Sequence, residues 1–279
     1  MFDAVSPSDA PVLQRARGEL DVTLGRRGDA TVLRDLRQAG CLKARFPRGG
    51  AAGWHETVVL NSSGGVAAGD RLSLRFRVQD GAQACFAAQA AERFYRAPAG
   101  SAPALVRTAV AVEDGAAAEW LPQETILFDG VCLDRSLDVD LAAGSWFLGV
   151  EQLIFGRAAM GETLRHGALR DRVRVRRGGR LLLHETVRMA GDIAALLKRP
   201  AVGAGAGAVA TLVHVAPDAE ARLPALRAAM TGAEAGASAW DGMLVARALA
   251  ADGAGLRRIV AAALAVLRGA RNLPRVWRC

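Results

Sequence analysis

Apolar and polar side chains alternate along much of this 279-residue chain, and the alternation predicts its fold class. In residues 71–79, RLSLRFRVQ, the apolar residues Leu72, Leu74, Phe76 and Val78 alternate with polar residues. A period of two predicts a β-strand with one face buried and the other in water. Similar runs, separated by Gly, Pro or Asn, extend from Glu19 to about Val187 and include ELDVTL, TVLRDL, CLKARF, ETVVL, ALVRTAVAV and DRVRVRR.

Turn residues between these runs support a sheet-rich fold. Gly178 and Gly179 separate two alternating runs, and consecutive glycines supply the positive φ angles that a two-residue hairpin needs. A Glu-Asp-Gly turn at residues 113–115 separates two further predicted strands. Strands do not alternate with helices in this part of the chain, which argues against a doubly wound, Rossmann-like sheet.

The last third of the chain has a helical periodicity. Residues 217–232 place Leu223, Leu226 and Met230 three and four positions apart, which predicts an amphipathic helix. Residues 256–268, LRRIVAAALAVLR, predict a second helix, and the proline that follows them prevents its extension.

The periodicities together predict one mainly β domain. Between the two helices, residues 240–250 return to a pattern that predicts a strand. The fold class is therefore predicted to be mainly β, with a single large β-sheet-rich domain over residues 19–279 and two α-helices near the C-terminus. Residues 1–18 are predicted to be a flexible N-terminal segment.

The glycine-rich stretch NSSGGVAAGDRL at residues 61–72 raises the question of a phosphate-binding loop. Gly64 and Gly69 have the spacing of P-loop glycines, but a P-loop continues with Lys and Ser or Thr, which hold phosphate and Mg²⁺. Here Asp70 and Arg71 follow, and the next segment is predicted to be a strand rather than a helix. The sequence therefore argues against a nucleotide site and indicates a turn that presents an acid.

The formal net charge of +8 invites comparison with nucleic-acid-binding proteins. Lys43 and Lys198 are the only lysines, so nearly all of the positive charge is arginine. The arginines are spread along the chain, without the basic helix stripe or interleaved aromatic residues that are typical of nucleic-acid binders. We therefore expect no nucleic-acid partner.

The sequence also bears on location in the cell. Residues 1–11, MFDAVSPSDAP, contain acids and prolines and lack the apolar stretch of a secretory signal. The longest uncharged run, residues 201–217, consists mainly of small residues and is too short and too weakly apolar to span a bilayer. Four cysteines without a C-x-x-C pair fit a reducing compartment. We expect a cytoplasmic protein without a membrane partner.

Residues for nucleophilic or metal chemistry are not clustered along the sequence. There is no G-x-S-x-G motif for a nucleophilic serine. His184 and Glu185 are neighbours in a predicted strand, so their side chains point to opposite faces and do not readily chelate one ion. The histidines lack the short spacings of metal ligands and are each interpreted as structural or surface residues: His55, His166, His184 and His214.

Six carboxylates stand within or beside apolar strands, where a charge is costly unless it is paired, hydrated or functional. For any one of them, an ion pair with one of the many arginines is the simplest interpretation. As a group they suggest an acid-lined interior path, since carboxylate oxygens bind divalent ions. Alternatively, a small-molecule hydrolase would use Glu124, Asp129 and Glu162 as an acidic pocket. The six residues are Asp70, Glu124, Asp129, Glu151, Glu162 and Glu185.

Five longer motifs carry a resemblance to a known family. They are GGVAAGDRL at 64–72, AAERFYRA at 90–97, EWLPQETILFDG at 119–130, IFGRAAMGETLRHG at 154–167 and LPRVW at 273–277. In this order and over nearly the whole chain, they resemble the urease accessory protein family UreD, which is called UreH in some organisms. EWLPQETILF and FGRxxxGE are too long and unusual for a chance match.

The resemblance implies an assembly chaperone rather than an enzyme. Such a protein would bind the urease apoprotein and recruit the accessory protein UreF and the GTPase UreG, so that nickel is inserted into the urease active site. No cofactor would be permanently bound, and Ni²⁺ would bind transiently. The family fold is mostly β with a pair of helices, as the periodicity independently predicts.

The resemblance also implies site residues. The glycine-rich turn would present Asp70 toward an interior nickel route, and the acid after the Gly178–Gly179 hairpin would be Glu185. We expect Asp70→Ala or Glu185→Ala to lower urease activation while complex formation stays intact. Further residues of the family motifs are Gly64, Gly65, Gly69, Tyr95, Arg96, Glu124, Gly156, Arg157 and Glu162.

Three positions depart from the family pattern. Ala68 replaces a glycine, which implies a stiffer turn or a different φ angle there. Glu92 and Arg93 stand where a small hydroxyl residue and a lysine are common, so the polar lining contributed by this segment is expected to differ.

Overall fold

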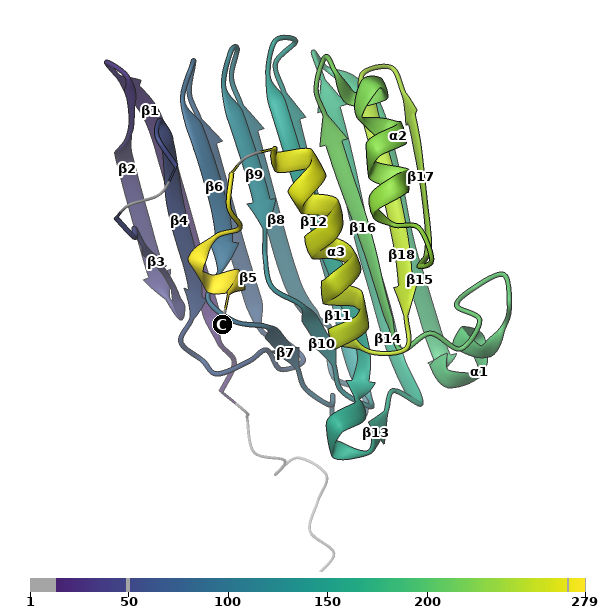
Figure 1. Ribbon diagram of the computed structural model, residues 1–279. Helices are drawn as coiled ribbons and strands as arrows, with labels where there is room; N and C mark the ends of the chain where they lie inside the picture. Colours follow the sequence, from purple (N-terminus) through teal and green to yellow (C-terminus); the bar gives the residue numbers. More distant parts are fainter. Residues whose placement is uncertain (1–13, 49–50, 270, 279) are drawn as a thin grey trace, which may run out of the picture.

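The computed structural model describes residues 14–48, 51–269 and 271–278, whose strands form two stacked β-sheets (Figure 1). The first sheet has seven strands in the order β15 (Arg180–Asp192), β14 (His166–Arg177), β11 (Val131–Leu141), β8 (Ala104–Val112), β5 (Arg71–Val78), β1 (Arg17–Arg27) and β2 (Ala30–Gly40). The prediction of a mainly β fold is confirmed.

The second sheet has eleven strands. Its main path runs β17 (Glu234–Trp240), β18 (Met243–Ala250), β16 (Ala208–Val215), β12 (Trp146–Arg157), β9 (Ala117–Leu121), β6 (Gln83–Ala88), β4 (Trp54–Asn61) and β3 (Leu42–Arg45). Three short strands lie off this path at one end of the sheet: β7 (Glu92–Phe94), β10 (Thr125–Leu127) and β13 (Glu162–Thr163).

Consecutive long strands alternate between the two sheets. In the first sheet β5, β8, β11 and β14 are parallel neighbours, and in the second sheet β4, β6, β9 and β12 are parallel neighbours. The chain therefore winds as a flattened coil, and each turn of the coil adds one strand to each sheet. The turn at residues 113–115 accordingly links β8 in one sheet to β9 in the other and closes no hairpin.

Two tight hairpins lie in the second half of the chain. The predicted hairpin at Gly178 and Gly179 is confirmed, because β14 and β15 are antiparallel on either side of these residues. The strand predicted over residues 240–250 is confirmed from Met243 onward, as β18. It begins later than predicted because a turn at 241–242 reverses the chain between β17 and β18.

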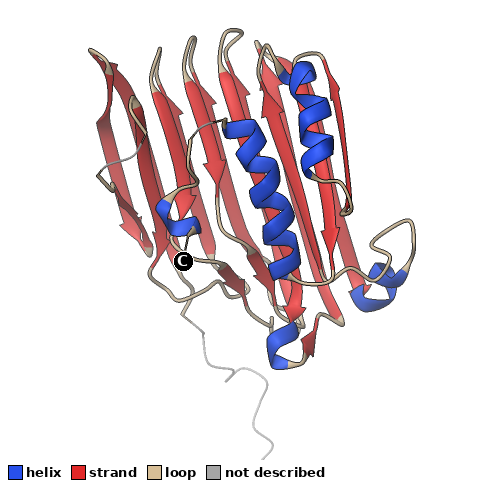
Figure 2. Ribbon diagram, viewed as in Figure 1, coloured by secondary structure: helices blue, strands red, loops and turns tan. Residues whose placement is uncertain are grey.

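Three α-helices lie in the described part of the chain: α1 (Ile193–Lys198), α2 (Ala219–Ala229) and α3 (Gly253–Arg268). The two predicted helices are confirmed as α2 and α3, and both cover the outer face of the second sheet (Figures 1 and 2). The short helix α1 was not predicted. It begins directly after β15, where the Asp192 carboxylate accepts a hydrogen bond of 2.8 Å from the Ala195 amide.

The central strands of the second sheet, such as β12 and β16, are buried on both faces. Because side chains alternate along a strand, Phe147 of β12 points into the main core between the sheets, whereas Leu148 points toward the helices. The face toward the helices packs against Leu256, Val260 and Leu264 of α3. Burial on both faces explains why β12 and β16 read as nearly continuous apolar runs.

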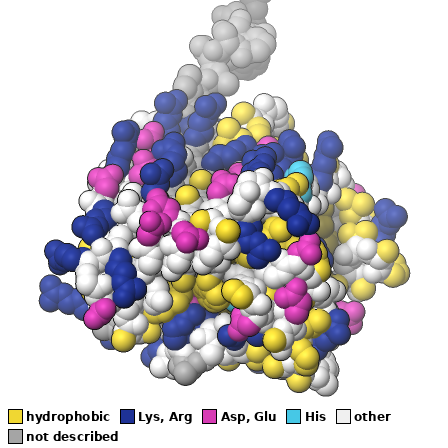
Figure 3. Space-filling model, turned by 90° about the horizontal axis from the view of Figure 1, so that it is seen from above, with side chains coloured by type: hydrophobic (Ala, Val, Ile, Leu, Met, Phe, Trp, Pro, Cys, Tyr) yellow, Lys and Arg dark blue, Asp and Glu magenta, His cyan; other side chains and the backbone are white. Residues whose placement is uncertain are grey.

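The outer face of the first sheet is polar. Its arginines pair with acids on neighbouring strands, for example Arg75 with Asp21 at 3.0 Å and Arg107 with Asp134 at 2.9 Å. Seen from the end of the sandwich, basic and acidic side chains are interspersed rather than segregated (Figure 3).

The N-terminal segment predicted over residues 1–18 falls largely outside the described residues, which begin at residue 14. Strand β1 begins at Arg17. No helix in the described part of the chain is long and apolar enough to cross a membrane.

Candidate functional site: a polar cavity between the sheets

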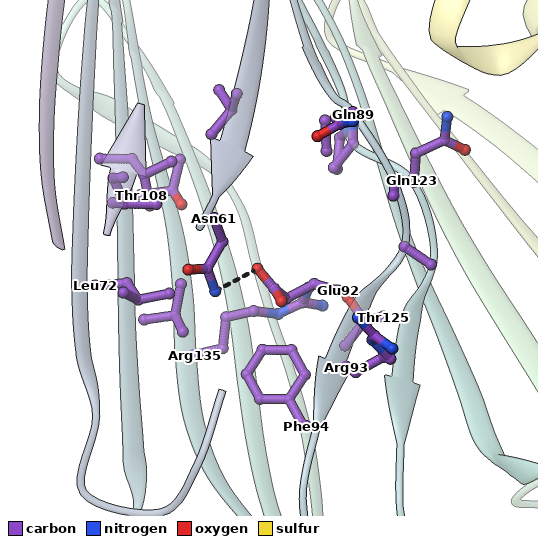
Figure 4. A pocket seen from close by; sticks show the side chains of 18 of the residues that line it. Asn61, Leu72, Gln89, Glu92, Arg93, Phe94, Thr108, Gln123, Thr125 and Arg135 are labelled. Carbon is purple, nitrogen blue, oxygen red and sulfur yellow. Dashed lines mark hydrogen bonds between the residues drawn. The ribbon is translucent and has the colours of Figure 1, made fainter. Parts of the chain in front are cut away.

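A cavity of about 260 Å³, here called the interior cavity, lies between the two sheets beside the glycine-rich turn (Figure 4). Apolar side chains such as Leu72, Phe94 and Trp120 form part of its wall. Ten polar side chains of the described residues also line it: Asn61, Gln89, Glu92, Arg93, Thr108, Gln123, Thr125, Arg135, Ser136 and Glu151.

A buried charge network crosses this cavity from one sheet to the other. Arg135 on β11 contacts Asp171 on β14 through Nε–Oδ1 at 2.9 Å and Nη2–Oδ2 at 2.5 Å. Its Nη1 atom lies 2.9 Å from Glu151 on β12 and donates a hydrogen bond of 2.7 Å to the Thr125 hydroxyl. The indole of Trp120 donates to Glu151 at 2.8 Å. The network therefore ties both sheets to one guanidinium group.

The environment shifts the pKa values of the ionisable groups in the cavity. Burial opposes the charge of Arg135, but the carboxylates of Asp171 and Glu151 outweigh it and raise the pKa of Arg135. Burial raises the pKa of Glu151, and the charge of Asp171 adds to the effect, against the opposing influence of Arg135. Burial also raises the pKa of Glu92, which accepts a hydrogen bond of 3.1 Å from the Asn61 amide (Figure 4). A cation entering the cavity would stabilise both glutamates in their charged form.

Four sequence motifs meet at the end of the sandwich next to this cavity. The Tyr95 hydroxyl donates to the carbonyl oxygen of Gly64 at 2.5 Å, and its ring packs edge-on against Phe128 at 5.2 Å between centroids. The guanidinium of Arg157 lies 4.0 Å from the centre of the Phe128 ring and pairs with Glu162 at 2.7 Å. Residues that are far apart in sequence thus form one continuous cluster.

The fifth motif joins the same region from the C-terminal end. The Trp277 indole donates a hydrogen bond of 3.0 Å to the carbonyl oxygen of Leu121, and the side chain of Gln123 donates to the carbonyl oxygen of Val276. The segment after α3 is therefore anchored to the strand that continues into the cavity wall.

Asp70 is buried, and its carboxylate is engaged with the backbone. Its Oδ1 atom accepts a hydrogen bond of 2.8 Å from the Ala16 amide, and its Oδ2 atom accepts one of 2.7 Å from the Ala67 amide. Asp70 thereby joins the segment before β1 to the glycine-rich turn. It is not among the residues that line the interior cavity.

Glu185 lies on β15, at the far edge of the first sheet from the glycine-rich turn. Its Oε2 atom lies 2.5 Å from the Arg247 guanidinium, and its Oε1 atom accepts a hydrogen bond of 3.1 Å from Thr211. These contacts bridge the edges of the two sheets. The structure therefore does not bring Glu185 together with Asp70.

The acids assigned to the alternative hydrolase pocket are held by different arginines. Glu124 pairs with Arg257 at 3.0 Å, and Glu162 pairs with Arg157. Asp129 accepts backbone hydrogen bonds from residues 165 and 166; these and the Arg165 side chain outweigh its burial and lower its pKa. The side chain of Arg96 lies 3.3 Å from the same carboxylate. None of the three acids lines the interior cavity.

Two glycine positions explain how the motifs fit together. Gly65 has a φ of +142°, and a Cβ atom there would lie 2.5 Å from the Tyr95 ring. Gly156 has a φ of +91°, and a Cβ atom there would lie 2.5 Å from the carbonyl oxygen of Glu162. Ala68 lies outside the positive-φ positions of the turn, which include Gly64 and Gly69, so an alanine is accommodated there.

The sequence interpretation did not single out Arg135 or Asp171, and Glu92 was noted only as a departure. A usable signal existed, because Asp171 shares its strand face with Val173 and Val175, which are buried. Arg135 likewise shares a face with Leu133 and Leu137. A charged residue on the buried face of an alternating strand indicates an interior ion pair.

The cavity offers oxygen donors rather than a closed metal cage. Within residues 14–48, 51–269 and 271–278, no three His, Cys, Asp or Glu side chains lie close enough to hold a metal ion together. Two glutamates and several neutral oxygen donors line the cavity beside the guanidinium groups of Arg93 and Arg135, so a divalent ion there would be held only weakly.

Comparison with known proteins gives a consistent result over nearly the whole chain. The model of the UreD urease accessory protein family matches residues 16–278. A "Urease accessory protein UreD" of Xanthobacter autotrophicus is 45% identical over 274 residues, which are 98% of this chain and 93% of that protein. Proteins of the same name from Azorhizobium caulinodans and Dinoroseobacter shibae are each 46% identical, over 96% and 99% of this chain and 98% and 95% of their own lengths.

Proposed function

The chain belongs to the UreD family of urease accessory proteins, and we propose that it acts as a chaperone in urease maturation. In this proposal it binds the urease apoprotein and recruits UreF and, through UreF, the GTPase UreG for GTP-dependent nickel insertion. The observation that carries the proposal is the family match over residues 16–278. The relatives are named accessory proteins, and we propose that this chain has no catalytic activity of its own.

We further propose that the interior cavity is part of a transient path for Ni²⁺, which is the cargo. Glu92 and Glu151 line it, and burial raises the pKa of both, so a cation must compete with a proton for each carboxylate and is held weakly. Neutral oxygen donors such as the side chains of Asn61 and Thr125 complete the lining. Nickel held by a few oxygen atoms leaves easily, whereas a closed His and Cys site would retain it.

Asp70 and Glu185 remain candidates for the nickel path because of the family resemblance. In the present conformation, however, Asp70 accepts two backbone hydrogen bonds and Glu185 is paired with Arg247. Nickel binding at either residue would require the displacement of these partners. Glu92 and Glu151 are the first choice for mutagenesis because they line the cavity, although Glu151 is likewise paired, with Arg135.

Co-purification tests the chaperone proposal directly. A tagged form of the chain is co-expressed with the apo-urease subunits, UreF and UreG, and purified through the tag. We expect urease and UreF to co-purify, and UreG to join when guanine nucleotide is present. Recovery of the folded chain without any of these proteins would overturn the proposal.

The nickel path has a separate test in Glu92→Gln and Glu151→Gln, which remove the charge and keep the side-chain size. We expect urease activity at limiting nickel to fall about tenfold in each variant, while co-purification with apo-urease stays unchanged. Glu234→Gln on β17 is the matched control, since Glu234 is exposed and far along the chain from the cavity residues. Full urease activity in both cavity variants would exclude this path without affecting the chaperone proposal.

A further inference from the structure

A second cavity, of about 420 Å³ and here called the arginine cavity, lies beside the C-terminal segment. Trp54, Glu56 and Cys85 contribute to it from strands β4 and β6 of the second sheet. The end of α3 and the residues after it close the other side with Arg268 and Arg271. It is separate from the interior cavity, whose walls include Val59 and Ala88, at the far ends of the same two strands from Trp54.

A row of polar side chains crosses three parallel strands at the arginine cavity, and two of its members, Glu56 and Cys85, line the cavity. Glu56, Cys85 and Glu119 pair in register on β4, β6 and β9, so they project from the same face of the sheet. Glu119 is fully buried and receives Arg268 at 2.9 and 3.0 Å and Arg271 at 2.7 Å. Two guanidinium groups therefore share one carboxylate.

Positive charge exceeds negative charge around this cavity. Among the described residues, four arginines line it, at positions 268, 271, 275 and 278, and the carboxylates of Glu56 and Glu119 lie beside them. Burial lowers the pKa of Arg271 and the neighbouring Arg268 lowers it further, although Glu119 opposes the change. By contrast, Glu119 outweighs burial at Arg268 and raises its pKa. The described residues thus neutralise the positive charge of Arg271 only in part.

Two buried polar atoms on the cavity wall have no hydrogen-bond partner within the described residues. One is the donor Nη1 of Arg271, and the other is the acceptor Oε1 of Glu56. The Arg271 guanidinium is held in place by the Trp54 ring, whose centre lies 3.7 Å away. Buried polar groups are rarely left unpaired in native proteins, and such a group indicates a bound water or ligand.

We propose that the arginine cavity binds a small oxyanion that also carries a hydrogen-bond donor, of the class of hydrogencarbonate and hydrogen phosphate. An oxygen atom of the anion accepts from Nη1 of Arg271, and its hydroxyl group donates to Oε1 of Glu56. An anion of similar shape without a hydroxyl group, such as nitrate, satisfies the arginine but is repelled by the Glu56 carboxylate. This inference is independent of the nickel path and of the proposed urease partners.

Ligand binding to the purified full chain tests the proposal. Hydrogencarbonate, hydrogen phosphate, nitrate and chloride are titrated at constant ionic strength and pH, and binding is followed by calorimetry and by the shift in Tm. We expect hydrogencarbonate or hydrogen phosphate to bind at least about tenfold more tightly than nitrate, and the tighter of the two identifies the natural class of ligand. Equal effects of all four anions would show that water fills the cavity and would overturn the proposal.

Variants locate the binding site. Arg271→Gln is expected to abolish the preference for the hydroxyl-bearing anion, whereas Arg258→Gln, the same charge change at an exposed position of α3, is expected to preserve it. Glu56→Gln is expected to bring the affinities for hydrogencarbonate and nitrate within about threefold of each other, because the repulsion of nitrate is removed. If Arg271→Gln does not fold, the test rests on Glu56→Gln alone. An unchanged preference for hydrogencarbonate over nitrate in Glu56→Gln would overturn the assignment of the anion to the arginine cavity.

Discussion

Arg135 on β11 and Asp171 on β14 form a forked ion pair in the interior, with contacts of 2.9 and 2.5 Å, although they are 36 residues apart in the chain. Their side chains are only 11% and 7% exposed. The two residues are direct neighbours across parallel strands. Because a buried guanidinium is costly without a counter-charge, this pair constrains both strands beside the interior cavity.

Removal of one member of this pair should destabilise the protein strongly. Asp171→Asn leaves Arg135 with Glu151 as its remaining carboxylate, and we expect the free energy of unfolding to fall by about 3 kcal/mol. The triple variant Arg135→Met/Glu151→Gln/Asp171→Leu removes all three charges of the network and should recover most of this loss. Urea unfolding measures both values. A loss below about 1 kcal/mol for Asp171→Asn would mean that Glu151 alone neutralises Arg135.

Asp70→Ala should reduce stability as well as any nickel transfer. The change leaves the backbone amides of Ala16 and Ala67 without their hydrogen-bond acceptor. We expect the free energy of unfolding to fall by roughly 2–5 kcal/mol. Asp80→Ala, at an exposed position, serves as the control and should change stability by less than about 0.5 kcal/mol. Urea unfolding measures the stability of each variant, and urease activity and co-purification with apo-urease are measured on the same variants. Unchanged stability of Asp70→Ala with reduced urease activation would assign Asp70 to the nickel path instead.

The glycine-rich turn provides a matched pair of substitutions. At Gly65 an added Cβ atom would meet the Tyr95 ring at 2.5 Å, whereas at Gly64, with a φ of +77°, it would meet nothing within 4 Å. We expect Gly64→Ala to lower the free energy of unfolding by about 1 kcal/mol through backbone strain alone. Gly65→Ala should lower it by about 3 kcal/mol, because the clash with the Tyr95 ring adds to the strain. Thermal unfolding measures both. In the Tyr95→Ala background the cost of Gly65→Ala should fall, and an equal cost in both backgrounds would contradict the steric explanation.

Acid should destabilise the protein through His214, which is fully buried between the second sheet and the helices. Neither of its ring nitrogens has a hydrogen-bond partner in the described part of the chain, and burial lowers its pKa to about 4. In the unfolded chain the pKa is about 6.5, so the unfolded state binds the proton first as the pH falls. The stability associated with the neutral ring is complete above pH ~6.5 and is lost progressively toward pH ~4.

The variant His214→Leu isolates this effect. We expect its free energy of unfolding, relative to the natural chain, to rise by about 2–3 kcal/mol between pH 7 and pH 4.5. Urea unfolding at both pH values gives the difference, in which the other titrating groups cancel. A constant difference between the two proteins would show that His214 does not titrate in this range.

Local sequence patterns carried much of the information about the elements. Alternation identified strands such as β5, and the pair Gly178–Gly179 identified the hairpin between β14 and β15. Helices α2 and α3 followed from apolar residues at helical spacing. These features depend on neighbours within a few residues, so they can be read from the chain itself.

The partners of the carboxylates depended on the tertiary structure. The fully buried Glu119 is separated by 149 residues from Arg268, with which it forms two contacts, and nothing in either local sequence identifies the other. Glu92 also required the tertiary structure, because its role in the cavity depends on neighbours from other strands.

The sequence by itself thus determined the fold class, most of the elements and the family of this protein. Only the tertiary structure decided which sheet each strand joins, which acids face a cavity and which are paired with arginines. The physical reason is that alternation specifies which side chains of a strand are buried, but not which strand lies beside it. The coil of parallel strands places residues from different turns side by side, so charges that are distant in the sequence become partners.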